Sequence, residues 1–345
     1  MPVTYAVVGG GVVGCAVALA LARRGREVTL FEVEQGIGLA ASGTNSGILH
    51  TGFDSKLGEL ETALILRAAP LREEAINALS IPVLRCGARM RDAPAEIELN
   101  AQILGVHVVR EGTDLLVPGE SVTNPVAMTH ALCAEAERVG AHVHLHHRVT
   151  DELPSFSVVV NCAGLYADEV ARAFGDDSFA IAPRKGEFLV FPDPGLTEIL
   201  LPVPAPRTEG ILAFPTLDGH VCCGPTAVDI EDKSDWSVRD DARKTLSRRA
   251  KALLPGLVGQ PMFAYAGLRP AGANDENYVI GWSSYSERLL NVAAIRSTGL
   301  TAALGIADFV CCDLLGVDSR PAPYGRGKTV DGVWWRRTAE YRGLS

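Results

Sequence analysis

Residues Val3–Glu32 carry the sequence VTYAVVGGGVVGCAVALALARRGREVTLFE. The apolar run Tyr5–Val8 predicts a buried strand that ends at a cluster of glycines. An alanine-rich helical run extends from there to Arg24, and Gly25 stands where the C-terminal cap of a helix is expected. A second strand is predicted over Glu27–Phe31. Strand, glycines, helix and strand in this order predict a βαβ nucleotide-binding unit.

The glycines of this unit form the pattern G-x-G-x-x-G at Gly9, Gly11 and Gly14. Gly9 allows a tight turn, and Gly14 lets the helix and the strand pack closely. Gly11 lets backbone N–H groups approach a pyrophosphate at the positive end of the helix. Glu32 ends the second strand, where it can accept hydrogen bonds from a ribose hydroxyl and would repel a 2′-phosphate. The unit therefore predicts a dinucleotide site, but by itself it does not separate NAD from FAD.

Length and composition narrow the class of protein. The 345 residues suffice for two domains, or for one large domain with an insertion. A formal net charge of −9 gives no electrostatic reason to expect nucleic acid or an anionic membrane surface as a partner. The first strand begins next to Met1, and no apolar run reaches the length of a transmembrane helix. The eight cysteines include no CxxC, so we expect a cytoplasmic protein with reduced thiols.

The rest of the chain alternates between two kinds of pattern. A small-residue loop, residues 35–47, leads to His50, and the apolar spacing of residues 56–79 predicts a helix that Pro70 would break. Short alternating segments between residues 81 and 122 predict β structure. Asn124 then predicts an N-cap, and a strong apolar strand at Ser157–Asn161 resumes the β-α-β order.

Several segments together resemble the FAD-dependent oxidoreductases of the D-amino acid oxidase-like family. That family includes glycine and sarcosine oxidases, glycerol-3-phosphate dehydrogenases and L-2-hydroxyglutarate dehydrogenases. The most specific segment is Asn45–Gly52 (NSGILHTG), which is similar to the NSG-x-x-H-x-G stretch of the L-2-hydroxyglutarate and anaerobic-type glycerol-3-phosphate dehydrogenase branch. Further resemblance lies in Asn124–Ala127, Asn161–Asp168, Arg184–Glu187 and Gly299–Thr301, and the similarity covers most of residues 1–316.

The resemblance implies an α/β fold in which a Rossmann-like FAD-binding domain is interrupted by a β-rich substrate domain with a mixed sheet. We assign residues 1–80, 123–180 and 262–316 to the FAD-binding domain, and residues 81–122 and 181–261 to the substrate domain. The C-terminal tail, residues 317–345, has no periodic pattern and is expected to be an irregular arm or a partly ordered tail.

The resemblance also implies FAD as the cofactor. It implies that the cofactor is bound by Gly9, Gly11, Val12, Val13, Gly14, Glu32, Val33, Ala41, Ser42, Thr44, Asn45, Ser46, Gly47, Val149, Cys162, Ala163, Gly164, Arg269, Thr298, Gly299, Leu300 and Thr301. In this family the segment corresponding to Gly299–Thr301 brings a helix N-terminus to the pyrimidine edge of the flavin. A helix N-terminus stabilises negative charge, and a plain NAD dehydrogenase would not need this segment, so the set favours FAD over NAD.

Two residues are the candidates for catalysis. His50 has an ordinary pKa suited to taking a hydroxyl proton near neutral pH, although it could also be a structural loop histidine or one that only hydrogen-bonds the flavin. Arg269, in a Gly-x-Arg-Pro segment, resembles the arginine that this family presents over the flavin, and a guanidinium can bind a carboxylate in bidentate fashion. The alternative interpretation is that Arg269 forms an ion pair at the protein surface. Arg296 is a second anion contact or a helix-terminus residue, and Lys185 is expected to be an exposed strand lysine.

For the other conspicuous residues, the sequence supports no chemical role. His142, His144 and His146 would share one face of a strand, but no Cys, Asp or Glu at ligand spacing completes a shell, so no metal is expected. The pairs Cys222-Cys223 and Cys311-Cys312 are expected to pack as small apolar residues. The Trp334-Trp335-Arg336-Arg337 segment predicts either a partner-docking arm or an ordered tail packed on its own domain.

The sequence therefore predicts an FAD-dependent dehydrogenase or oxidase. Its substrate would be a small anion, either a 2-hydroxy acid like L-2-hydroxyglutarate or a molecule like glycerol 3-phosphate, which passes hydride to flavin N5. Oxygen, a quinone or a partner protein stays open as the electron acceptor. Two alternatives also stay open: an amine oxidase of the same fold acting on an amino acid such as glycine or sarcosine, and a flavin-binding subunit without turnover of its own.

Overall fold

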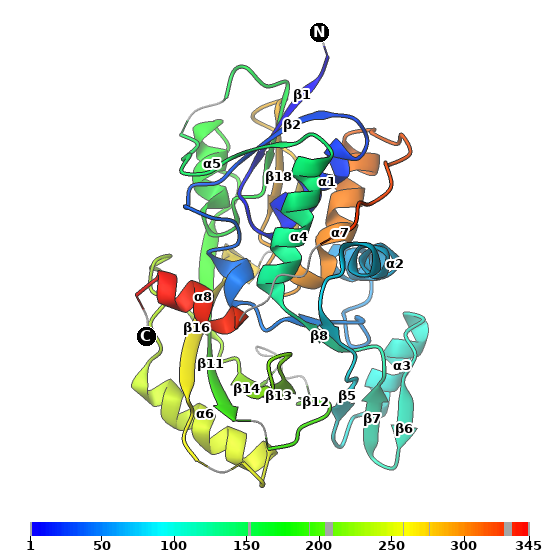
Figure 1. The fold of residues 1–345 in the computed structure, drawn as a ribbon, viewed down its shortest axis with the longest axis vertical. Helices are drawn as coiled ribbons and strands as arrows, with labels where there is room; N and C mark the ends of the chain where they lie inside the picture. Colours follow the sequence, from blue (N-terminus) through cyan, green and yellow to red (C-terminus); the bar gives the residue numbers. More distant parts are fainter. Residues whose placement is uncertain are drawn as a thin grey trace.

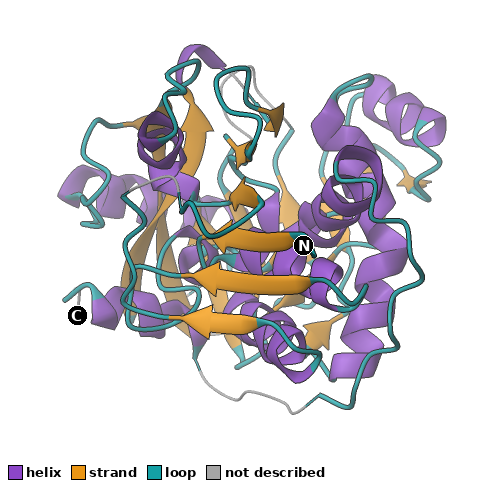
Figure 2. Ribbon diagram, turned by 90° about the horizontal axis from the view of Figure 1, so that it is seen from above, coloured by secondary structure: helices purple, strands orange, loops and turns teal. Residues whose placement is uncertain are grey.

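A computed structural model describes residues 2–150, 153–192, 194–203, 210–257, 259–275, 277–327 and 333–343. Across these ranges the strands form three sheets, of six, nine and three strands. Helices pack along the six-stranded sheet, as the view from above in Figure 2 shows, and the nine-stranded sheet lies at the other end of the molecule (Figure 1). The α/β class predicted from the sequence is confirmed.

The six-stranded sheet is the one that the glycine-rich N-terminus begins. Its strands, in spatial order, are β17 (Val279–Trp282), β18 (Leu289–Ala293), β10 (Val158–Asn161), β1 (Thr4–Val8), β2 (Glu27–Phe31) and β9 (His142–His144). All neighbours are parallel except β17, which runs antiparallel to β18. Val8 pairs with both Phe31 and Asn161, so the glycine turn, Glu32 and Cys162 leave the sheet at the same edge. That edge is where a doubly wound sheet binds its ligand.

The two faces of β1 follow the alternation expected of a strand. Tyr5 and Val7 belong to the core that β1 shares with α1 (Val12–Ala22), α2 (Leu60–Leu79), α4 (Pro125–Arg138) and α7 (Gly299–Phe309). Ala6 and Val8 belong to the core on the opposite face, together with α5 (Ala167–Ala173). A strand covered on both faces must be apolar throughout, which is why TYAVV carries no charge.

Two local predictions can be compared directly with the helices. Asn124 caps α4 as expected, since its side-chain oxygen accepts hydrogen bonds from the N–H groups of Val126 and Ala127. The predicted break at Pro70 is wrong, because α2 continues through it. Pro70 is exposed, so water can solvate the carbonyl that loses its helical partner.

The nine-stranded sheet has the spatial order β15 (Val228–Asp229), β11 (Ile181–Pro192), β14 (His220–Gly224), β13 (Leu212–Pro215), β12 (Ile199–Leu201), β5 (Ala88–Met90), β7 (Asp114–Val117) and β6 (Val109–Glu111). The ninth strand, β16 (Phe263–Gly272), pairs with β11 along ten residues. α6 (Asp240–Leu253) contacts this sheet, and α3 (Ala95–Ile103) lies near β6 and β7 (Figure 1). β16 falls within residues 262–316, which the predicted division counts with the FAD-binding domain; that division remains a proposal.

A small third sheet connects the two larger ones. It consists of β3 (Ile48–Leu49), β8 (Ser121–Thr123) and β4 (Val83–Leu84), all antiparallel. β3 ends directly before His50, and β8 begins directly after Glu120. Because Leu49 pairs with Ser121, this sheet brings two residues that are seventy positions apart to the same place.

The C-terminal tail contains a helix that the sequence analysis did not predict. α8 (Trp334–Tyr341) packs against β16 and the short helical turn η1 (Ala41–Thr44), and Figure 1 shows it in red beside β16. Trp334 and Trp335 are almost fully buried, with ring contacts to Tyr265 and Phe263. An amphipathic segment of eight residues is too short to show clear periodicity, so its burial depends on tertiary contacts. No helix in the described ranges is long and apolar enough to cross a membrane.

Candidate active site

A cavity of about 600 Å³ opens at the carboxyl edge of the six-stranded sheet and extends between the two larger sheets. Its walls come from the glycine turn after β1, the loop after β2, the end of β10, and the segments that follow β3 and β18. β11, β16 and the start of α7 complete it. A cavity of this size at the switch point of a parallel sheet is the usual place for a cofactor and a small substrate.

Most of the residues predicted from the sequence line this one cavity: His50, Arg269, Gly9, Gly11, Val12, Val13, Glu32, Val33, Ala41, Ser42, Thr44, Asn45, Ser46, Val149, Cys162, Ala163, Gly164, Gly299 and Leu300. Gly14, Gly47, Thr298 and Thr301 are not among the lining residues. Gly14 is there for packing, because a Cβ on it would lie 1.9 Å from the Gly9 carbonyl oxygen. Thr301 acts through its contacts with His50, described below.

The glycine turn fits a pyrophosphate. Gly9 has φ +110°, and a Cβ on it would lie 2.4 Å from the Cys162 carbonyl oxygen, so no other residue fits there. Within 4 Å, a Cβ on Gly11 would meet only the Ser42 hydroxyl, at 3.2 Å. The backbone at the start of α1 is therefore accessible from the cavity, and the Val12 N–H donates to that hydroxyl (2.9 Å). A helix N-terminus in this setting binds phosphate oxygens.

Glu32 lies at the cavity wall beside the glycine turn. Its carboxylate accepts hydrogen bonds from the N–H groups of Gly10 (2.6 Å) and Glu34 (2.8 Å). Burial raises the pKa of Glu32, and these backbone donors offset part of that rise. A carboxylate oxygen accepts more than one hydrogen bond, so Glu32 can also receive a ribose hydroxyl. The cavity, the open glycine turn and Glu32 together fit the ADP part of FAD.

His50 is held by the chain on two sides. Its N–H donates to Thr301 Oγ1 (3.0 Å), which ties it to the first turn of α7. Its Nδ1 lies 3.1 Å from Glu120 Oε2. The side chain of His50 is 24 % exposed, whereas that of Glu120 is fully buried. His50 thus faces the cavity with a buried carboxylate behind it.

Glu120 was not among the residues predicted from the sequence. Its Oε1 accepts hydrogen bonds from the Thr51 N–H (2.6 Å) and the Thr51 hydroxyl (2.9 Å). Burial alone would raise the pKa of Glu120, but the charge and hydrogen bond of His50 and the donors of Thr51 lower it below its ordinary value. No motif marks this glutamate, because only the pairing of β3 with β8 brings it next to His50.

A buried arginine supports the same region. Arg72 on α2 is 6 % exposed, and it donates to the Thr301 carbonyl (2.9 Å) and to the His50 carbonyl (3.4 Å). Burial lowers the pKa of Arg72, and the charge of Glu120 acts against that shift. Through Arg72, three elements are joined behind the cavity: α2, the loop after β3 and the start of α7.

Arg269 lies on β16 opposite Arg184 of β11 and lines the cavity from the side of the nine-stranded sheet. Its Nη2 donates to the Thr226 carbonyl oxygen (2.6 Å). The neighbouring strand leaves room for its guanidinium at Gly186, since a Cβ there would lie 2.5 Å from Arg269 Nη2. Gly186 therefore belongs to the site, and the sequence analysis assigned it no role of its own.

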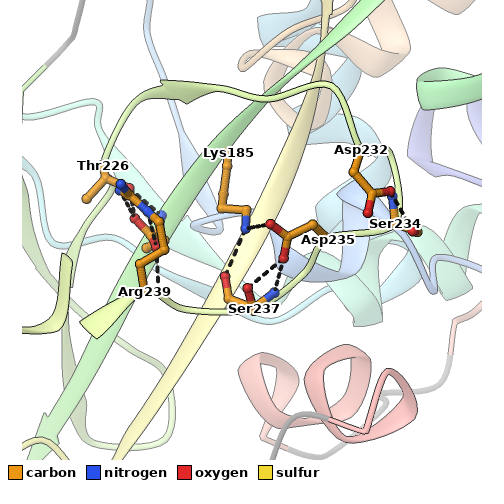
Figure 3. A network of polar contacts seen from close by, with 8 residues as sticks. Lys185, Thr226, Asp232, Ser234, Asp235, Ser237 and Arg239 are labelled. Carbon is orange, nitrogen blue, oxygen red and sulfur yellow. Dashed lines mark hydrogen bonds and ion pairs between the residues drawn. The ribbon is translucent and has the colours of Figure 1, made fainter. Parts of the chain in front are cut away.

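The Thr226 segment that holds Arg269 is itself fixed by buried ionic groups (Figure 3). The Thr226 hydroxyl donates to Glu187 Oε2 (2.7 Å), and the Arg239 guanidinium pairs with the same fully buried carboxylate (2.7 Å). Lys185 pairs with Asp235 (2.6 Å) and donates to the Ser237 carbonyl (3.2 Å). The expectation of an exposed lysine is wrong: the loop between β15 and α6 folds over β11 and buries it.

Arg296 and Arg342 are two of the further arginines that line the cavity. Arg296, at the turn before α7, lies 3.7 Å from Glu61 of α2, so it is partly neutralised. Arg342 follows α8 and donates to Glu34 Oε1 (2.7 Å) and to the Leu39 carbonyl (3.1 Å). Its guanidinium also lies 5.1 Å from the ring centroid of Trp236. The C-terminal segment thus closes over the loop that follows Glu32, a role that the tail's sequence did not indicate.

The remaining predictions concern residues that were not assigned to the site. Within the described residues no cluster of His, Cys, Asp or Glu could hold a metal ion. The strand predicted to carry His142, His144 and His146 is shorter than expected, because β9 covers only His142–His144 and His146 has φ 56°. Cys222, Cys223 and Cys311 are buried as expected, and Cys312 is half-buried.

Comparison with known proteins identifies relatives of this arrangement. The family model for FAD-dependent oxidoreductases of the DAO type matches residues 4–312. The chain is 27 % identical to glycerol 3-phosphate dehydrogenase of Caloramator mitchellensis, over 88 % of this chain and 72 % of that protein. It is 26 % identical to the mitochondrial L-2-hydroxyglutarate dehydrogenase of Mus musculus, over 73 % of this chain and 67 % of that protein.

Solved structures show the same fold. The FAD-bound, dithionite-reduced L-alpha-glycerophosphate oxidase of Mycoplasma pneumoniae superposes with a TM-score of 0.84 at 21 % identity, covering 96 % of this chain and all of the other. Glycine oxidase of Bacillus cereus superposes with a TM-score of 0.75 at 18 % identity, covering 92 % of this chain and 98 % of the other.

Proposed function

Since the chain belongs to the family of FAD-dependent oxidoreductases, whose members use FAD in dehydrogenase and oxidase reactions, we propose that it oxidises the secondary hydroxyl of a small anion. The substrate class is that of glycerol 3-phosphate and the 2-hydroxy acids. The observation that carries the proposal is that His50, a base, and Arg269, a fixed cation, line the same cavity as the glycine turn. The relatives named as glycerol 3-phosphate and L-2-hydroxyglutarate dehydrogenases support the same class.

Arg269 would bind the anionic group of the substrate. Its guanidinium is oriented by the Thr226 carbonyl and keeps its charge at all physiological pH values. A planar guanidinium can bind either a carboxylate or a phosphate in bidentate fashion. Arg296 adds a second positive charge to the cavity wall, weakened by its partner Glu61.

His50 would take the proton of the hydroxyl. Breaking the substrate C–H bond moves an electron pair out of the molecule, and forming the C=O bond releases the hydroxyl proton, which needs a base. Bound FAD would accept that electron pair as hydride at N5. The N-terminus of α7, whose Gly299 and Leu300 line the cavity, would stabilise negative charge that develops there. Holding base and substrate in contact supplies much of the rate.

The test is an anaerobic screen of the FAD-loaded protein. We expect glycerol 3-phosphate or L-2-hydroxyglutarate to remove the absorbance of oxidised flavin, while glycine and sarcosine leave it unchanged. The variant His50→Asn should keep its flavin and reduce it about 10²- to 10⁴-fold more slowly, the usual contribution of a positioned base. Arg269→Met should instead raise the substrate concentration needed for half-maximal reduction.

Amine oxidation is the second candidate, because glycine oxidase shares the fold. A neutral amine can lose hydride without a strong base. If sarcosine or glycine bleaches the flavin and His50→Asn does not slow that reaction, the amine function replaces the alcohol function. Flavin that none of these compounds reduces would instead favour a binding subunit without turnover.

A further inference from the structure

We propose that Glu120 is a positioning residue for the reaction, which fixes the imidazole of His50 through Nδ1 and stabilises the imidazolium that forms when His50 takes the substrate proton. The inference rests on the proposed function and assigns a role to a residue outside every motif in the sequence. It starts from the short contact between the two side chains, 3.1 Å, and from the complete burial of the carboxylate.

The donors around Glu120 keep it ionised. Its Oε1 accepts two hydrogen bonds from Thr51, and its Oε2 faces His50 Nδ1. Arg72 adds a buried positive charge nearby. An ionised carboxylate only accepts hydrogen bonds, so Nδ1 must carry the proton in this contact. Nε2 is then the basic nitrogen of His50, and the carboxylate selects the tautomer that can take a proton from substrate.

The charges around His50 explain why such a partner is needed. Arg72 donates to the His50 carbonyl, and Arg269 and Arg296 line the same cavity as His50. Each of these positive charges disfavours a further positive charge on His50. Glu61 is paired with Arg296 and compensates that arginine first. Glu120 is the carboxylate in direct contact with the imidazole. It therefore allows His50 to become cationic as substrate C–H cleavage delivers hydride to FAD and the hydroxyl proton moves to Nε2.

The decisive experiment measures the protonation of His50 itself in the FAD-loaded, full-length protein. His50 is one of eight histidines, and its NMR resonance is assigned by its loss in His50→Asn. We expect Glu120→Gln to shift the titration of His50 to lower pH. The rate of anaerobic flavin reduction should fall about 10- to 100-fold, the range seen when carboxylate partners of metal-binding histidines are removed. In the pH profile of this rate, the limb that reports His50 should move to lower pH together with the titration of His50.

Two further variants separate positioning from folding. Glu135→Gln removes a buried glutamate of α4 that pairs with Arg138 and should change neither the titration nor the rate. Thr51→Val removes one donor but leaves the carboxylate, so it should shift the titration of His50 to higher pH, and it serves if Glu120→Gln does not fold.

The outcomes are distinguishable. An unchanged titration of His50 in Glu120→Gln overturns the inference, even if the rate falls, because the residue would then be merely structural. An unchanged titration of His50 in Thr51→Val overturns the inference as well. If no hydroxylated anion reduces the wild-type flavin, the proposed function fails, while the NMR comparison still decides whether Glu120 controls His50.

Discussion

Gly186→Ala should disable Arg269 while leaving the fold and the cofactor in place. The two residues lie on adjacent strands, Gly186 on β11 and Arg269 on β16. A Cβ at position 186 would stand 2.5 Å from Arg269 Nη2 and 2.9 Å from the Pro225 Cβ. The guanidinium is the end of a flexible chain and can retreat, and it makes the closer of the two contacts. The Pro225 Cβ belongs to a rigid ring, so the segment around Pro225 must also shift slightly.

The size of the effect follows from these distances. Ordinary contact begins near 3.5 Å, so Nη2 must retreat by about 1 Å. The hydrogen bond from Arg269 to the Thr226 carbonyl is 2.6 Å long and does not survive a retreat of that size. A misplacement of about 1 Å can cost about 100-fold in rate, equivalent to about 2.7 kcal/mol. Overpacking should lower the free energy of unfolding by about 1–3 kcal/mol.

The assay is stopped-flow reduction of the flavin under anaerobic conditions. The quantity to compare between variant and wild type is the rate constant of flavin reduction divided by the substrate dissociation constant. Gly281→Ala in β17 is the matched control, because its Cβ would meet nothing within 4 Å. The double variant Gly186→Ala/Arg269→Ala should be no worse than Arg269→Ala alone, since both changes remove the same contact. Full activity in Gly186→Ala, or a loss that adds to that of Arg269→Ala, would refute the reasoning.

Three other results are expected. Arg342→Ala removes two hydrogen bonds from the C-terminal segment to the loop after Glu32 and should weaken FAD binding about tenfold, measured by flavin fluorescence on dilution. Asp235→Asn leaves the buried ammonium of Lys185 unpaired and should cost about 3–5 kcal/mol in denaturant unfolding, whereas Lys185→Met, which leaves a solvated carboxylate, should cost much less. The pKa of Glu120 in the folded protein is lowered from its ordinary value of 4.5. The ionised carboxylate therefore adds to the free energy of unfolding above that pH, and this contribution is lost as the pH falls below it. Between neutral and acidic pH, the free energy of unfolding should fall less in Glu120→Gln than in the wild type.

The part of the fold that the sequence predicts well is the part with strong local patterns. The strand Thr4–Val8 is apolar because it is covered on both faces, and the glycines after it are required by contacts within one βαβ unit. The N-cap at Asn124 is equally local. Where the pattern is weak the predictions fail: Pro70 does not break α2, and α8 was not predicted. In both cases burial and exposure, which depend on neighbouring elements, decide the outcome.

The candidate site divides in the same way. The residues that resemble the family's cofactor segments meet around one cavity, although they come from positions 9 to 300 of the chain. The residues that orient them carry no such pattern. The sequence assigned no role to Glu120, Gly186 or Arg342, and each acquires its role from a contact with a residue at least seventy positions away, or from a strand pair.

The sequence by itself determined the nucleotide-binding unit, the family and the two catalytic candidates, His50 and Arg269, because glycine turns, helix caps and short motifs act over a few residues. The tertiary structure decided what holds those candidates in place. The pairing of β3 with β8 puts a carboxylate behind the histidine, and the pairing of β11 with β16 gives the arginine its room and its direction. Strand pairing joins distant residues through backbone hydrogen bonds that are the same for almost any side chain, so the sequence carries little record of which residues will meet.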